Sequence, residues 1–159
     1  MTDAHAAEKS TVAKVPIEVF FATITDYLAY PEILDDIQTA SVVSREGHVT
    51  TVAFTLKVLF RTFDYTLRMV EEPPTGGMAK LTWSLVSSGT LAQNDGGWRL
   101  EALSPTETKV TYWNELAARS WLPKTFINGL ARIVLPKMLK RWAHYAETHH
   151  AAAQARQGS

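Results

Sequence analysis

The chain contains no cysteine among its 159 residues. This absence excludes a disulfide framework, a thiolate nucleophile and a cysteine-ligated metal, and it is compatible with the reducing cytoplasm in which we expect the protein to reside. Net charge is lacking too, because 16 basic residues balance 16 acidic ones. Without a positive charge excess or a recognisable nucleic-acid-binding module, the sequence predicts no nucleic acid partner.

Long apolar runs are also absent. No stretch approaches the ~18 uninterrupted apolar residues of a membrane-spanning helix, and the polar first residues, MTDAHAAEKS, predict no signal peptide. With 46% hydrophobic and 20% charged residues, the composition is that of an ordinary globular protein. The length favours one domain, expected over residues 1–149, followed by a frayed tail rich in Ala and Gln over residues 150–159.

Motifs typical of catalysis or cofactor binding are missing as well. Both glycine pairs, Gly76-Gly77 and Gly96-Gly97, are flanked by predicted strands, which excludes a phosphate-binding loop before a helix. The acidic residues match no calcium loop. His144 and His149 are five residues apart and do not share a helical face as a pair four apart would. The sequence therefore predicts no metal and no cofactor, and it leaves the catalytic residues of any enzyme unknown.

What the sequence does contain is a strong strand signal. Alternating apolar and polar residues predict seven strands, over residues 7–14, 39–45, 48–58, 62–71, 78–86, 90–103 and 108–116. The tetrad Asn94-Asp95-Gly96-Gly97 interrupts the sixth. It either closes a hairpin or bends one long strand through a glycine bulge, and the shortness of the segment before it favours the bulge. Residues 71–77 predict a loop.

Helices are expected on either side of the six later strands. Pro16 suits the first turn of a short helix with an apolar face over residues 17–24, and Pro31 opens a second over residues 32–37. A long amphipathic helix is predicted over residues 122–147. Its apolar face is formed by residues spaced three and four apart: Ile127, Leu130, Val134, Met138, Trp142 and Tyr145. This order predicts an α+β fold with an antiparallel sheet and helices on one face.

Three segments resemble a known family. VPIEVFFATITDYLAYPEIL, WRLEALSPTETKVTYWNEL and LPKMLKRWAHYAE are similar to the START-like superfamily, also called SRPBCC, in its polyketide cyclase/dehydrase and ubiquinone-binding branch. The resemblance covers roughly residues 7–147. It implies a helix-grip fold, in which a seven-stranded antiparallel sheet wraps around a long C-terminal helix, with two short helices after the first strand and a deep apolar cavity. Because family members place their active groups differently, the resemblance transfers no catalytic residue.

The candidate binding residues lie on the inward faces of the predicted strands and on the apolar face of the long helix. They are Phe54, Tyr65, Leu67, Trp83, Trp98, Tyr112, Asn114, Leu130, Val134 and Met138. Most of them can form an ordinary core, but the buried hydroxyl and indole groups need hydrogen-bond partners, which a cavity provides. Asn114 either bonds the backbone at a strand end or holds a ligand. We predict binding of a hydrophobic or aromatic small molecule or lipid; the alternative is a polyketide cyclase/aromatase or dehydratase.

The balanced total charge conceals two segments of opposite sign. Residues 15–44 contain five acidic residues and no Lys or Arg, and residues 116–146 contain six basic residues and no acid. One interpretation is that two solvated helix faces attract each other across the fold. The other is that the basic C-terminal helix makes a peripheral contact with an anionic membrane or an acidic partner.

Overall fold

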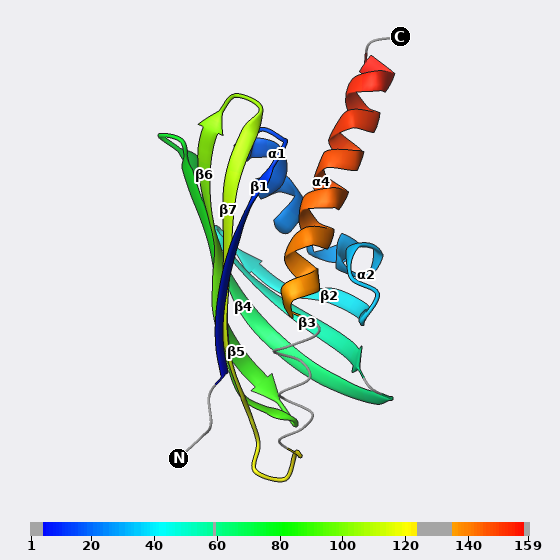
Figure 1. Cartoon of the computed structure of the whole chain (residues 1–159). Coiled ribbons are helices and arrows are strands. Elements are labelled where there is room, and N and C mark those ends of the chain that lie inside the picture. Colours follow the sequence, from blue (N-terminus) through cyan, green and yellow to red (C-terminus); the bar gives the residue numbers. More distant parts are fainter. Residues whose placement is uncertain (1–4, 59, 124–134, 158–159) are drawn as a thin grey trace.

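The computed structural model describes residues 5–58, 60–123 and 135–157. These residues form seven strands, two α-helices with a 3₁₀ turn between them, and a long helix (Figure 1). In chain order the elements are β1 (His5–Ala13), α1 (Ile17–Ile24), η1 (Tyr27–Ala29), α2 (Tyr30–Ile33), β2 (Ile37–Glu46), β3 (Val49–Val58), β4 (Arg61–Thr75), β5 (Met78–Ser88), β6 (Leu91–Ser104), β7 (Glu107–Ala118) and α4 (Leu135–Gln157).

The described strands form one antiparallel sheet in the order β1-β7-β6-β5-β4-β3-β2. Strands β2 to β7 are consecutive neighbours, and β1 joins the edge beside β7. The sheet curves, and α1, α2 and α4 all lie on its concave side (Figure 1). The predicted α+β helix-grip fold is therefore confirmed.

The connection between β4 and β5 is shorter than predicted. Residues 71–75, expected in a loop, belong to β4, and only Gly76 and Gly77 form the turn. Both have positive φ, 62° and 77°, a conformation that glycine adopts without steric cost. A two-residue turn of this kind lets β4 continue to Thr75 and β5 begin at Met78.

The glycine tetrad lies inside β6. The sequence favoured one long strand here over a hairpin, and the structure has one continuous strand. The predicted bulge is wrong, because pairing with β7 runs without a register shift from Asn94–Leu116 to Gly97–Trp113. The glycines have a packing reason instead. A Cβ on Gly96 would lie 2.4 Å from the carbonyl oxygen of Trp113 and 2.9 Å from the ring of Trp83. Glycine at this position lets the strands and the Trp83 ring approach closely.

The short helices differ from prediction in their bounds. α1 buries its predicted apolar face of Ile17, Phe20, Phe21 and Ile24. The second helix was expected over residues 32–37 but occupies Tyr30–Ile33, preceded by the 3₁₀ turn. It ends early because Leu34 is already extended, with φ −120° and ψ 113°, and leads into β2.

The long helix continues further than predicted. α4 runs to Gln157, so the segment expected to fray from residue 150, and the domain boundary placed there, fall within a helix. Alanine and glutamine favour helix strongly, which accounts for the extension. The predicted start of this helix, with Ile127, Leu130 and Val134, lies outside the described residues. None of the helices described is long and apolar enough to cross a membrane.

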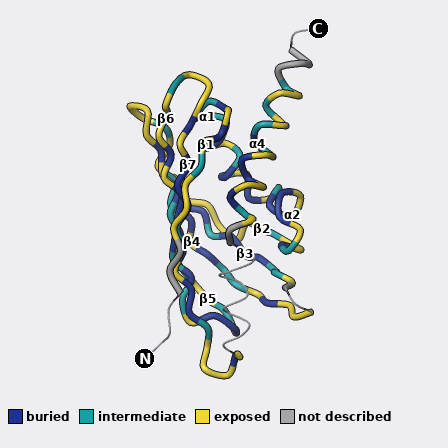
Figure 2. The backbone as a smooth tube through the Cα atoms, in the orientation of Figure 1, coloured by how far each residue is buried: buried dark blue, intermediate teal, exposed yellow. Residues whose placement is uncertain are grey.

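The core lies between the sheet and the helices (Figure 2). Trp98 of β6 is at its centre, 2% exposed, with its ring edge-on to the rings of Phe20, Tyr112 and Trp142. These three partners come from α1, β7 and α4. One indole therefore holds both helices against the middle of the sheet, at one end of the cavity described next.

Candidate ligand-binding cavity

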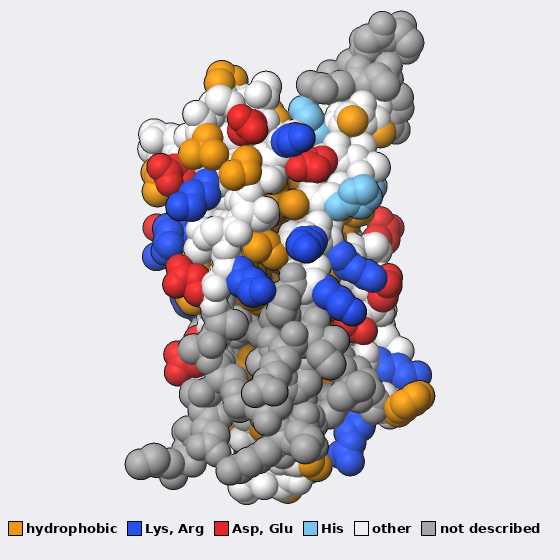
Figure 3. All heavy atoms as spheres, in the orientation of Figure 1, with side chains coloured by type: hydrophobic (Ala, Val, Ile, Leu, Met, Phe, Trp, Pro, Cys, Tyr) orange, Lys and Arg blue, Asp and Glu red, His pale blue; other side chains and the backbone are white. Residues whose placement is uncertain are grey.

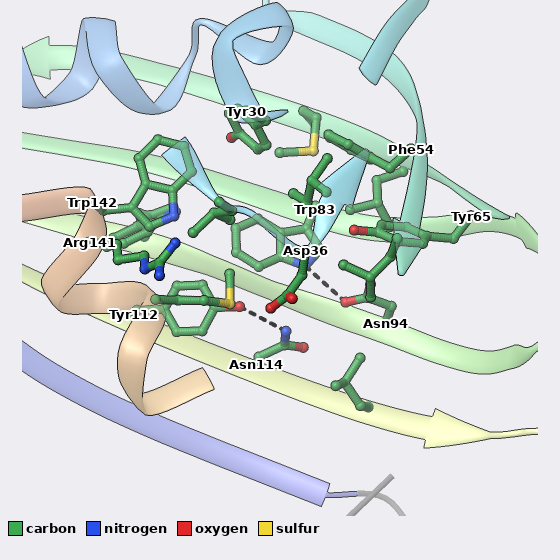
Figure 4. Close-up of a pocket in the computed structure, with 18 of the residues that line it drawn as sticks. Tyr30, Asp36, Phe54, Tyr65, Trp83, Asn94, Tyr112, Asn114, Arg141 and Trp142 are labelled. Atoms are coloured by element: carbon green, nitrogen blue, oxygen red, sulfur yellow. Dashed lines mark hydrogen bonds between the residues drawn. The ribbon is translucent and has the colours of Figure 1, made fainter. Parts of the chain in front are cut away.

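A cavity of about 410 Å³ lies between the concave face of the sheet, the first turns of α4 and the connection from α2 to β2 (Figure 4). Strand alternation creates it. Residues two apart on β3, β4, β6 and β7 direct their side chains to the same side, and the sheet's curvature spreads them around a shared volume. Its size lies within the ~300–1,000 Å³ that is usual for small-molecule sites.

The structure brings together eight of the ten predicted binding residues. Phe54, Tyr65, Leu67, Trp83, Trp98, Tyr112, Asn114 and Met138 all line the cavity. The other two, Leu130 and Val134, lie outside the described residues. That the eight residues contact a ligand stays a prediction.

Aromatic rings form a continuous wall along one side of the cavity. The Tyr30 ring stacks on Phe54 at 5.4 Å between centroids, and Phe54 stacks on Tyr65 at 5.3 Å. Tyr30 also meets Trp142 of α4 edge-on at 4.8 Å. The Tyr30 hydroxyl donates to the carbonyl of Ile24, which fixes the ring position. This wall is aromatic and largely apolar, as contact with a flat or hydrophobic ligand requires.

Polar atoms are concentrated on strands β5 to β7. The indole nitrogen of Trp83 donates to Oδ1 of Asn94 at 3.1 Å, and Nδ2 of Asn114 donates to the Tyr112 hydroxyl at 2.9 Å (Figure 4). Asn114 thus bonds a side chain and not the backbone, contrary to one of the two interpretations. Its Oδ1 is buried and has no hydrogen-bond partner among the described residues.

The cavity tyrosines are neutral hydrogen-bonding groups. Burial raises the pKa of Tyr65 well above its usual range, and the nearby Tyr112 raises it further. Burial also raises the pKa of Tyr112, although the hydrogen bond from Asn114 opposes the shift. Both hydroxyls consequently keep their protons at neutral pH and can donate them in hydrogen bonds.

Charged side chains lie at the rim. Arg141 of α4 pairs with Asp35 at 2.5 Å, and Lys137 and Asp36 also border the cavity. Figure 4 shows the carboxylate of Asp36 turned toward the cavity. Basic side chains on α4 have acidic ones beside them in Figure 3. The Asp35–Arg141 pair agrees with the interpretation that the acidic and basic segments attract each other.

Sequence reasoning missed three of the groups that define the site. Asn94 has the same parity as Trp98 on β6, so alternation indicated its inward position, but the glycine tetrad to which it belongs was predicted to form a bulge. Tyr30 and Asp36 lie outside regular strands, where no periodicity indicates which way a side chain points. Asp36 belongs to the acidic segment over residues 15–44, which one interpretation assigned to a solvated helix face. Among the described residues, no three metal-ligating side chains gather to hold an ion.

Comparison with known proteins identifies the family. The family model described as polyketide cyclase / dehydrase and lipid transport matches residues 13–143. The chain belongs to this family, and its START-like assignment is confirmed. None of the curated proteins matches the chain in sequence.

Solved structures share the fold at low sequence identity. A START superfamily protein from Mycobacterium smegmatis aligns with a TM-score of 0.75 and 14% identity, covering 91% of this chain and 98% of the other. The Zhui aromatase/cyclase from Streptomyces sp. R1128 aligns at 0.67 and 15%, covering 97% and 94%. Human STARD10 aligns at 0.79 and 12%, covering 97% of this chain and 68% of the other. These similarities establish the fold alone.

Proposed function

We propose that the protein binds a hydrophobic or aromatic small molecule or lipid inside the cavity. The observation that carries the proposal is the 410 Å³ volume walled by aromatic rings, bordered by Asn114, whose buried amide oxygen has no partner among the described residues. A solid core would not leave such a volume, because protein interiors pack about as densely as organic crystals. The family description, which includes lipid transport, supports the same class of ligand.

Extraction of the purified protein provides the test. The protein is denatured in organic solvent, and the extract is compared by mass spectrometry with that from a variant whose cavity is blocked, Leu67→Trp. An apolar compound present at a stoichiometric level in the first sample and depleted in the second supports the proposal. An empty extract, together with failure of apolar probes to bind the purified protein, contradicts it.

A second candidate function is catalysis on a polyketide-like substrate in the same cavity. It is favoured by Tyr65, Tyr112 and Asp36, which bring two hydroxyl donors and one carboxylate to the same volume. In this function the hydroxyls stabilise an enolate oxygen, Asp36 accepts a proton from carbon, and the walls restrict how a flexible chain folds. The solved aromatase/cyclase with the same fold makes this chemistry a natural comparison.

Replacement of the polar groups distinguishes the two functions. Tyr65→Phe, Tyr112→Phe and Asn114→Ala leave most of the apolar wall. For a binding protein, each should reduce affinity by about 1.5 kcal/mol or less. For an enzyme, turnover of a linear polyketide should fall roughly a hundredfold or more while binding persists, because the lost hydrogen bonds act in the transition state.

The proposal extends to membrane contact through α4. Lys137 and Lys140 are exposed, and neither forms an ion pair with another described residue, whereas Arg141 is paired with Asp35. Two exposed lysines without an ion-pair partner among the described residues, on the helix that borders the cavity, favour contact with an anionic surface. Sedimentation with vesicles containing phosphatidylserine should show binding that weakens in Lys137→Gln/Lys140→Gln. Equal sedimentation of both proteins would contradict this contact.

A further inference from the structure

One buried polar feature of the cavity is the pair formed by Tyr112 and Asn114 on β7. Because these residues are two apart on a strand, both side chains point into the cavity. The pair bonds internally only once, from Nδ2 of Asn114 to the Tyr112 oxygen. The amide oxygen of Asn114 and the proton of the Tyr112 hydroxyl have no partner among the described residues. The pair thus presents one free acceptor, the Asn114 oxygen, beside two free donors, the Tyr112 hydroxyl proton and the second amide proton of Asn114, counted among the described residues.

The unpartnered amide oxygen is well shielded. Asn114 is 6% exposed and its Oδ1 is buried, so bulk water does not satisfy this oxygen directly. A buried carbonyl oxygen without a hydrogen bond is unfavourable, and native structures rarely keep one without a reason. A ligand atom that donates to Asn114 would remove this penalty. The same atom would need to accept from Tyr112 to satisfy both members.

The surroundings decide which ligand groups meet these requirements. A ketone or ether accepts from Tyr112 but leaves the Asn114 oxygen unpaired, and an ammonium group donates but cannot accept. A carboxylate cannot donate to the amide oxygen of Asn114, because both groups are acceptors. Its negative charge would also be buried, while the described cations that border the cavity, Lys137 and Arg141, lie at the rim. A hydroxyl group both donates and accepts, and it is neutral.

We infer that the cavity selects an apolar molecule carrying a hydroxyl group, a phenol or an alcohol, whose oxygen lies between Asn114 and Tyr112. The inference rests on the proposed function, since it assigns the polar end of the ligand that the apolar wall holds. The hydroxyl donates to Oδ1 of Asn114 and accepts from the hydroxyl of Tyr112. Charged lipids and fatty acids bind less well at this point than neutral hydroxylated compounds.

Three probes with one ring system test the inference: 2-naphthol, 2-methoxynaphthalene and naphthalene. Their affinities for the full chain are measured by calorimetry or dye displacement. The wild type should bind 2-naphthol about tenfold more tightly than 2-methoxynaphthalene, which corresponds to the loss of about one hydrogen bond, the one donated to Asn114. In Asn114→Leu this preference should fall below about twofold, while naphthalene binds at least as well as before.

Glu115→Gln serves as the matched control. Glu115 neighbours Asn114 on β7 but is exposed on the opposite face of the sheet, so the preference should persist in this variant. If Asn114→Leu does not fold, the preference of the wild type is still measurable, and the ¹H–¹⁵N resonances of the Asn114 side chain should shift with 2-naphthol and not with naphthalene.

The outcomes distinguish failure of the hydroxyl assignment from failure of the proposed function on which it rests. Equal affinity of the wild type for all three probes would overturn the hydroxyl assignment and leave the apolar cavity site standing. Retention of the full preference in Asn114→Leu would also overturn the assignment. Failure of all three probes to bind would overturn the assignment and argue against the proposed function as well.

Discussion

Arg141 of α4 and Asp35 of the connection between α2 and β2 form an ion pair on the rim of the cavity. Both side chains are substantially exposed, at 49% and 77%, so the pair contributes little to global stability. Its position matters more than its strength. The two residues belong to different elements bordering the cavity, and any widening of the rim between these elements separates the charges.

Breaking this pair should therefore affect ligand exchange more than folding. In Arg141→Gln we expect the free energy of unfolding to change by about 1 kcal/mol or less, and ligand dissociation to accelerate about two- to fivefold. Stopped-flow displacement of a bound dye measures the rate. The control is Glu8→Gln, which breaks the exposed Glu8–Arg99 pair away from the cavity. Equal dissociation rates in wild type and Arg141→Gln would show that the pair does not restrain the rim.

The glycines of β6 give a prediction about stability. In Gly96→Ala the new methyl group would meet the backbone of Trp113 and the ring of Trp83, and the backbone cannot move away without disturbing the sheet. We expect a loss of about 2 kcal/mol or more in urea unfolding. Gly89→Ala is the matched control, because a Cβ there meets no atom within 4 Å. Similar stabilities of the two variants would refute this account of the glycine tetrad.

Buried tyrosines predict sensitivity to alkali. Burial raises the pKa of Tyr27, Tyr30, Tyr65 and Tyr112 above their usual value near 10. Below about pH 10 the folded and unfolded states both keep these protons, and the stability is fully present. Above that pH only the unfolded state releases them, so the free energy of unfolding should fall as pH rises.

Two measurements check the alkaline prediction. The urea midpoint of unfolding should stay constant up to about pH 10 and fall at higher pH. Tyrosinate absorbance at ~295 nm should appear together with loss of structure. In Tyr112→Phe the decline with pH should be shallower, because one fewer raised pKa contributes. Ionisation of most tyrosines near pH 10 in the folded protein would contradict the burial that the structure shows.

Much of the site was predictable because strands impose strict alternation. Inward parity on β3 to β7 located Phe54, Tyr65 and Tyr112, and Asp64 and Arg99, of opposite parity, are exposed. The apolar periodicity of the last helix located Met138. In each case a local repeat was enough, because one side of the element faces the core and the other faces solvent.

The remaining features depend on contacts between distant segments. Trp83 and Asn94 come from neighbouring strands, and no local pattern indicates that one indole would satisfy one amide. Asp36 points into the cavity because of the path between α2 and β2, which has no periodic signal. That the oxygen of Asn114 has no partner among the described residues can be seen only when all its described neighbours are known. The helical tail was also missed, although the propensity of its Ala and Gln residues favours a helix.

The central claim is that apolar molecules bind inside the cavity, and a calorimetric titration of three proteins with 2-naphthol tests it most directly. Leu67→Trp fills the cavity, whereas Leu103→Trp adds the same bulk at a β6 position that is 52% exposed and outside it. The account predicts that the wild type and Leu103→Trp bind with a negative heat-capacity change, and that affinity falls about tenfold or more in a folded Leu67→Trp. Equal binding by all three proteins would place the ligand elsewhere and contradict the account.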